Sequence, residues 1–258
     1  MKVSSLVGKT LDQFEVKPDQ MRPSDTAVGI EVEVENMRGS SCQGLKFWNT
    51  TQEGSIVRGC EFVSKPIWGT AITEALDELR ELFKKSDPYL SFRTSVHVHL
   101  NMLDSEHEHL NQLVLLNLLY EPALFRLHQE WGRYDNIFCV PARKSIKVQD
   151  GYAKLLQDLD QGRIRTDYVG YKYSAFNPNA LAQFGTIEFR HMGGTADMDE
   201  VDQWINVLLQ LKLAAVKGTE LTDHRKVFGK YHSLLDIHEE DIMDGMQLID
   251  YIQMKRGT

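Results

Sequence analysis

The sequence predicts an α+β fold built around a mostly antiparallel β-sheet. Runs of strictly alternating apolar and polar residues, typical of strands with one buried face, recur along the chain. Several of these runs are joined by short connections, as antiparallel strands can be, whereas parallel strands need long crossovers. Segments with helical periodicity lie between the strand pairs, and we expect them to cover the apolar face of the sheet.

The strands are expected within a single domain over 27–258, behind a short N-terminal arm. The arm, 1–26, is polar and contains two prolines. An Asn-Pro-Asn turn at 177–179 is expected to join the last two strands, because these residues favour tight turns. The candidate strands are 27–35, 45–48, 55–63, 95–101, 168–176 and 180–191.

Apolar residues at helical spacing predict the remaining elements. Pro122 interrupts one such region, which gives either a helical pair or one kinked helix. Residues 133–147 read as an ordered loop with clustered positive charge. The candidate helices are 71–83, 106–119, 123–130, 149–159, 197–216 and 237–254.

Composition narrows the class of protein. With 258 residues, 42% of them hydrophobic, the chain can bury a substantial core. Its net charge of -8 argues against a protein that grips nucleic acid. Three cysteines without metal-finger spacing favour a reducing compartment. With no apolar run of membrane-spanning length and no apolar signal core, we expect a cytoplasmic protein that binds no membrane. Because the chain has no evident extra assembly domain, we expect a monomer or homodimer.

The polar faces of the predicted strands carry an unusual set of side chains. Four carboxylates on one surface repel one another and raise one another's pKa unless cations lie between them, which favours divalent metal. Alternate residues on a strand are roughly 6.6 Å apart, so two carboxylates on one strand can serve neighbouring ions. Oxygen ligands with an imidazole suit Mg²⁺ or Mn²⁺ better than zinc. The set is Glu31, Glu33, Glu61, His97, His99, Glu188 and Arg190.

Taken alone, Glu188 and Arg190 are most simply an ion pair on a solvated strand. The three upstream strands with the same polarity favour a site instead.

The order of these motifs resembles that of the amidoligases of the glutamine synthetase and glutamate-cysteine ligase superfamily. Gly29–Glu33 looks like the family's first-strand Glu-x-Glu, and Gly59–Glu61 like its second acidic strand. Val96–His99 resembles its His-x-His strand, and Gly185–Arg190 its terminal Glu-x-Arg. Four motifs in the right order, over about residues 28 to 195, are more specific than any one alone.

The resemblance implies a glutamine synthetase-like sheet whose polar face forms the active site, with ATP and Mg²⁺ or Mn²⁺ as cofactors. Glu31, Glu33, Glu61 and Glu188 would be metal ligands with His97, and His99 would lie near the nucleotide phosphates. The roles of the two histidines could be exchanged. Arg190 would stabilise the transferred γ-phosphoryl group. A carboxylate substrate would be phosphorylated by ATP and then attacked by an amine.

Further basic residues are candidates for cofactor binding. Lys172 and Tyr173 stand where the family often has an Arg-Tyr pair before its Asn, so a bidentate grip by arginine would become a point charge on Lys172. Arg143 and Arg165, like Arg93, are either carboxylate or phosphate clamps or surface charge. Glu35, the third acid of its strand, is expected at the rim.

Three alternatives compete with a ligase. Cys60 could be a nucleophile with His97 or His99 as its base, but alternation turns it to the apolar face. The chain could be a non-catalytic Mg-nucleotide-binding module of the same fold. It could also be a phosphotransferase similar to guanidino kinases, with a different acceptor.

Overall fold

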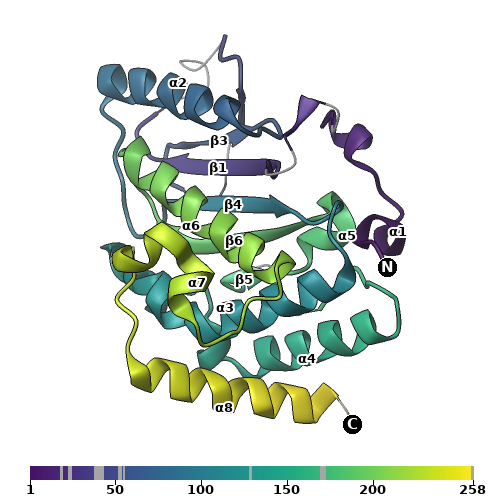
Figure 1. Cartoon of the computed structure of the whole chain (residues 1–258). Helices are drawn as coiled ribbons and strands as arrows, with labels where there is room; N and C mark the ends of the chain where they lie inside the picture. The colour runs from purple at the N-terminus through teal and green to yellow at the C-terminus, as the bar shows by residue number, and fades with distance from the viewer. Residues whose placement is uncertain are drawn as a thin grey trace.

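The computed structural model describes residues 1–17, 20–22, 25–37, 44–51, 54, 56–127, 130–168 and 173–256. Within this part of the chain, six strands form one sheet in the order β2-β3-β1-β4-β6-β5, and each neighbouring pair is antiparallel (Figure 1). The prediction of an α+β fold with an antiparallel sheet is therefore confirmed. The strands are β1 (Val28–Val34), β2 (Trp48–Thr51), β3 (Cys60–Ser64), β4 (Ser95–Asn101), β5 (Phe176–Asn177) and β6 (Thr186–Gly193).

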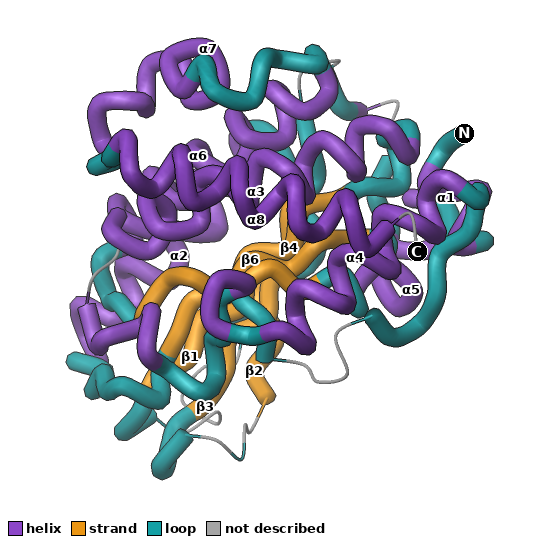
Figure 2. Tube along the Cα trace, turned by 90° about the horizontal axis from the view of Figure 1, so that it is seen from below, coloured by secondary structure: helices purple, strands orange, loops and turns teal. Residues whose placement is uncertain are grey.

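Helices gather on one side of the strands (Figure 2). The α-helices are α1 (Val3–Val7), α2 (Thr70–Ser86), α3 (His107–Leu127), α4 (Ile146–Asp160), α5 (Ala180–Phe184), α6 (Met198–Val216), α7 (His224–Phe228) and α8 (Glu239–Arg256). Short 3₁₀ helices are η1 (Leu11–Phe14), η4 (Glu130–Asp135), η5 (Ala142–Lys144) and η6 (Gly229–Leu234).

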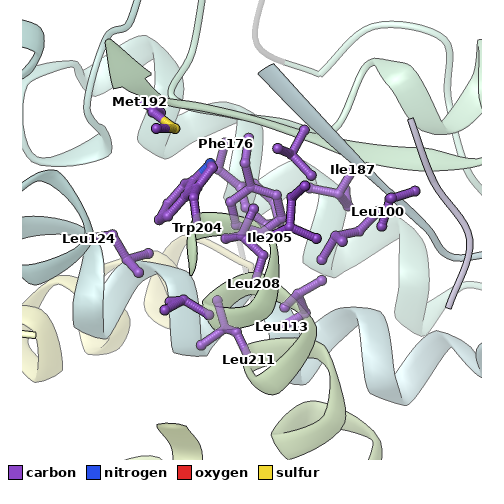
Figure 3. Close-up of a cluster of buried hydrophobic side chains, with 14 of the residues drawn as sticks. Leu100, Leu113, Leu124, Phe176, Ile187, Met192, Trp204, Ile205, Leu208 and Leu211 are labelled. Atoms are coloured by element: carbon purple, nitrogen blue, oxygen red, sulfur yellow. The ribbon is translucent and has the colours of Figure 1, made fainter. Parts of the chain in front are cut away.

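The core lies between the sheet and helices α3 and α6. Trp204, Ile205 and Leu208 of α6 meet Leu100 of β4 and Ile187 of β6 (Figure 3), and all five are almost fully buried. Alternation explains this side of the sheet, because the odd-numbered apolar residues of β6 and the even-numbered ones of β4 share one face. The opposite face is left to the polar residues.

Two predicted strands in the first half of the chain have wrong boundaries. The strand predicted at 45–48 is β2 at Trp48–Thr51, and the one predicted at 55–63 begins only at Cys60. Arg58 has a positive φ of 51°, which a continuous strand cannot contain.

Of the two alternatives expected at Pro122, the structure has one helix, α3, which contains that proline, and not a helical pair. The predicted loop over 133–147 includes η4 and η5.

The hairpin predicted at 168–191 is also wrong in part. Only Phe176 and Asn177 pair with β6, while Ala180–Phe184 form helix α5; residues 169–172 lie outside the described part. Ala180, Leu181 and Gln183 are strong helix formers. Gly185 ends α5 with a φ of 69°, and a Cβ atom there would lie 2.3 Å from the Leu103 side chain. The turn is therefore a short helix that leads directly into β6.

Glu121 is a buried acid in the helical layer, outside the polar face. It is fully buried on α3, and its carboxylate accepts hydrogen bonds from the backbone N–H groups of Ala142 and Arg143 at 2.9 and 3.3 Å. Burial raises the pKa of Glu121 to about 7, against the opposing effect of these donors. Because the folded pKa lies above the ordinary value, its contribution to stability is complete below about pH 4 and is lost as the pH rises through 7.

Glu121→Gln should therefore change the pH dependence of stability. Between about pH 5 and pH 8, we expect the wild type to lose about 2 to 3 kcal/mol of unfolding free energy relative to the variant, because glutamine has no proton to lose. Urea unfolding of both proteins at the two pH values measures this. A difference between the proteins that does not change with pH would contradict the assignment.

Candidate active site on the polar face

Strand register brings the predicted polar residues into cross-strand pairs. Glu31 of β1 lies opposite His97 of β4, and Glu33 lies opposite Glu61 of β3. His99 lies opposite Glu188 of β6. The four strands that carry the motifs are therefore adjacent, and their side chains form one contiguous polar surface.

A β-bulge adjusts β6 beside His97. Val98 pairs with Phe189 and Val96 with Met192, so two residues of β6, Arg190 and His191, face the single His97 of β4. A bulge re-aims side chains and increases the local twist. Here Arg190 stays with the polar face, whereas His191 packs against Trp204 in the core.

The first ligand cluster consists of Glu31, His97 and Glu188. The Nδ1 atom of His97 lies 2.9 Å from Oε2 of Glu31 and 3.6 Å from Oε1 of Glu188. His99 extends the cluster, with its Nε2 atom 3.3 Å from Oε1 of Glu31 and its Nδ1 atom 3.0 Å from the Thr186 hydroxyl. One ligand atom each from Glu31, His97 and Glu188 lies within 4.8 Å of the other two, as binding of a single metal ion requires.

A second cluster, formed by Glu33, Glu61 and His97, meets the same 4.8 Å criterion. The Ser95 hydroxyl lies 2.5 Å from Oε2 of Glu33 and 2.8 Å from Nε2 of His97. The Thr51 hydroxyl donates to Glu61 at 3.0 Å. The imidazole of His97 is thus shared between two groups of carboxylates.

Arg190 lies beside the first cluster, next to both Glu188 and His97. Its Nη1 atom pairs with Glu188 and lies 3.5 Å from Nδ1 of His97. The guanidinium also faces the Tyr173 ring at 5.6 Å. The second oxygen of Glu188 accepts a 2.7 Å hydrogen bond from Asn177, so both of its oxygens are oriented.

Charge pairing keeps the carboxylates ionised despite their burial. Burial opposes ionisation of Glu31, but hydrogen bonds and charge from His97 and His99 hold the pKa of Glu31 well below its usual range. Burial also opposes ionisation of Glu188, but the attraction of Arg190, His99 and His97 together lowers the pKa of Glu188. Burial would lower the pKa of His99, yet the neighbouring Glu31 and Glu188 raise it. The surface is a compact array of opposite charges.

The donor set fits a hard divalent cation. Carboxylate oxygens from three strands and one imidazole match the ligands of Mg²⁺ or Mn²⁺. Their orientation by hydroxyl and amide groups is the second layer of contacts that metal sites commonly have. The residues that could hold such ions are the four glutamates and His97.

An apolar pocket adjoins the Glu31 end of this surface. Its volume is about 260 Å³, and its lining includes Gly29, Glu31 and His99 from the sheet. Leu11 and Phe14 come from η1, in the segment predicted as the N-terminal arm, and Phe184 comes from α5. The edge of the His99 ring packs against Phe184, with ring centroids 5.8 Å apart. A flat apolar group could therefore lie next to the first cluster.

Two of the basic residues predicted to bind the cofactor lie elsewhere. Arg143 donates a hydrogen bond to the backbone carbonyl of Asp241 and lines a separate cavity of about 570 Å³ beside α3 and α8. Arg165 pairs with the buried Asp158 of α4. The remaining candidate, Lys172, lies outside the described residues.

The expectation that Glu35 lies at the rim is wrong. Its side chain is buried and accepts a hydrogen bond from the backbone N–H of Val57 at 2.9 Å. Cys60 packs in the hydrophobic core, as alternation predicts.

Three polar residues of the site are absent from the sequence prediction. Ser95 and Thr186 share the alternation phase of His97 and Glu188, so the pattern could have identified them. Asn177 could not be found in this way, because it reaches Glu188 from a two-residue edge strand whose pairing the alternation does not specify.

The sequence matches the model of a known protein family. The model of the family described as "Putative amidoligase enzyme" matches residues 2–212, which include every strand of the sheet. No curated protein matches the sequence. Among the described residues, no helix combines the length and apolar character needed to cross a membrane. The match covers most of the chain, and the chain therefore belongs to the amidoligase family.

Proposed function

We propose that this amidoligase is an ATP-dependent carboxylate–amine ligase whose polar sheet face holds Mg²⁺ or Mn²⁺ with the nucleotide. The observation that carries the proposal is the pair of carboxylate clusters that share His97, with Arg190 beside one of them. The motif order also supports a glutamine synthetase-like placement of the fold.

The carboxylates and His97 would hold the cations, which neutralise the phosphate oxygens during transfer of the γ-phosphoryl group. Arg190 is well placed to stabilise the negative charge on the phosphoryl group that the cations would not neutralise. Its guanidinium is mostly buried and is fixed by Glu188 and by the Phe138 carbonyl at 3.3 Å. A donor held in this way needs no reorganisation as negative charge develops.

The position of the apolar pocket indicates how the nucleotide would be oriented on the sheet. A purine base would fit among Phe14, Phe184 and Leu11, and the adjacent His99 would then lie near the phosphates. The carboxylate substrate would approach from the opposite end, beside Glu33 and Glu61. The nucleotide and the acceptor would then lie on the two sides of the shared His97, where both could be positioned for phosphoryl transfer.

The proposed reaction has two steps. An oxygen of the substrate carboxylate attacks the γ-phosphorus of ATP, the bond to the β-γ bridging oxygen breaks, and ADP leaves. The amine nitrogen then attacks the acyl carbon of the mixed anhydride. Inorganic phosphate leaves with the former carboxylate oxygen, and the ammonium nitrogen loses a proton. Positioning and electrostatics suffice for both steps, so the protein needs no nucleophile of its own.

An amine-dependent release of phosphate tests this proposal. The protein is incubated with ATP and Mg²⁺ and screened against pairs of amino acids, polyamines and peptide carboxylates. We expect phosphate and ADP in equal amounts only when both a carboxylate and an amine are present. A phosphotransferase would instead leave the phosphate on its product. Binding of Mg-ATP by calorimetry without turnover in any combination would favour a binding module.

Phe14→Ala tests the position of the base. Stacking of a base on an aromatic ring is worth about 1 to 3 kcal/mol, so we expect the KM for ATP to rise by about 10-fold or more while kcat stays within about threefold. Tyr231→Ala, which removes an aromatic ring in η6 on the helical side, is the matched control. An unchanged KM for ATP in Phe14→Ala would place the base elsewhere.

A further inference from the structure

The cavity of about 570 Å³ beside α3 and α8 has an excess of positive charge. Within the described part of the chain, its charged lining consists of Arg126, Arg133, Arg143, Asp241 and Asp244. Three cations against two anions favour a negatively charged ligand. Helix α8, which supplies both aspartates, lies beyond residue 212, where the family match ends. The proposed ligase site uses none of these lining residues.

Arg133, in η4, is a buried cation whose charged end has no partner. The residue is only 1% exposed. Its Nε atom donates to the Arg190 carbonyl at 3.1 Å, but Nη1 and Nη2 have no hydrogen-bond partner. The Cys139 thiol donates to the same carbonyl at 3.0 Å and stays neutral, because burial raises the pKa of Cys139 to about 12. A buried guanidinium without an acceptor or a counter-charge destabilises the protein, and an oxyanion would supply both.

Arg143, in η5, brings a second unpartnered donor to the same cavity. Its Nη2 atom donates to the Asp241 carbonyl at 2.7 Å, and its Nη1 atom lies 3.8 Å from Oδ2 of the exposed Asp244. The Nε atom of Arg143 is buried and has no hydrogen-bond partner. The Asp241 carboxylate is already paired with Arg126. The acidic residues of the lining therefore leave donors of both Arg133 and Arg143 unsatisfied.

We propose that this cavity binds a compact oxyanion, either a phosphate or a carboxylate group, through Arg133 and Arg143. Arginine suits this ligand class, because its planar fork can bond two oxygens of one anion. The site goes beyond the proposed ligase function and needs no metal ion. It reaches the polar face only through the backbone, since Arg133 bonds the carbonyl of Arg190. A bound anion therefore holds η4 against β6.

Calorimetric titration of the full chain with inorganic phosphate, without metal or nucleotide, tests the proposal. We expect Arg143→Gln to weaken phosphate binding by about 10-fold or more, because it removes hydrogen bonds between charged groups. Arg80→Gln is the matched control, since Arg80 lies in α2 and pairs with Asp77 and Asp199. A parallel titration with acetate shows which oxyanion the site takes, as the one that binds more tightly. Circular dichroism checks that each variant folds.

Binding that is equally tight in Arg143→Gln would overturn the proposal, because the anion would then lie outside this cavity. The absence of binding by both phosphate and acetate would overturn it as well. Should Arg143→Gln fail to fold, ¹H–¹⁵N spectra of the arginine side chains in the wild type decide. Phosphate-induced shifts of the Arg133 and Arg143 signals support the site, and shifts confined to Arg190 contradict it. Neither Mg²⁺ nor ATP is present, so these results are independent of the proposed function.

Discussion

Glu188→Gln is expected to abolish Mg²⁺-dependent binding of ATP while leaving the fold intact. The substitution removes one negative charge from the first cluster but keeps the shape of the side chain and an oxygen for the Asn177 amide. Loss of a charged ligand should weaken binding of the Mg-ATP complex by at least about 100-fold. Calorimetric titration with Mg-ATP measures the effect.

Glutamine is the informative replacement at this position. Both replacements remove the carboxylate that pairs with the buried Arg190, but glutamine keeps an amide oxygen that can accept from the guanidinium. Alanine leaves the guanidinium with neither charge nor acceptor, and removing one partner of a buried pair costs about 3 to 5 kcal/mol. Glu74→Gln is the matched control, because Glu74 is an exposed residue of α2 paired with Lys46. If Glu188→Gln binds Mg-ATP as tightly as the wild type, Glu188 is not a ligand and the metal site is wrongly assigned.

Arg190→Lys should have the second large effect, and it should fall on kcat. Lysine keeps the buried positive charge but loses the planar fork that can contact two phosphoryl oxygens. For an arginine that stabilises charge on a transferred phosphoryl group, kcat falls by about 10³-fold or more, equivalent to about 4 kcal/mol. The KM for ATP should change by less than about 10-fold. Steady-state kinetics with varied ATP measures both.

A conservative change at another arginine controls for Arg190→Lys. Arg80 of α2 pairs with Asp77 and Asp199 on the helical side, so Arg80→Lys should leave kcat unchanged. A kcat for Arg190→Lys within about 10-fold of the wild type would show that Arg190 supports the structure of β6 and not phosphoryl transfer.

Alternation was enough to predict the polar surface of the sheet. Glu31, His97 and Glu188 were placed on one face from their spacing alone, and the structure places them in one cluster. The reason is that side chains of a strand alternate between the two faces of the sheet. Every second residue is buried on one face, and the remaining residues gather on the other. A strand with one buried face has only one acceptable phase, so these positions were strongly determined.

Features that depend on pairing between distant segments could not be predicted in the same way. The bulge opposite His97 puts Met192 in the core, although its even number assigns it to the phase of Glu188 and Arg190. Arg143 carries no local pattern that would distinguish a phosphate clamp from its observed contact with the Asp241 carbonyl. The two ligand clusters around His97 likewise depend on the rotamers of residues from four strands.

The contacts of the N-terminal segment also could not be predicted from a local sequence pattern. Its polarity predicted an arm, but Val3 and Val16 are buried, and Leu11 and Phe14 line the pocket beside His99. A few apolar residues in a polar segment carry no periodicity, and their contacts are set by the sheet that they cover.

The central claim is tested most directly by oxygen transfer from the substrate carboxylate. A carboxylate that supports amine-dependent phosphate release is labelled with ¹⁸O on both oxygens and turned over with unlabelled ATP and Mg²⁺. If an acyl phosphate forms and the amine displaces phosphate, each phosphate released carries one ¹⁸O atom, and mass spectrometry detects it. Phosphate without the label, with both ¹⁸O atoms retained in the product, would contradict carboxylate–amine ligation on this sheet.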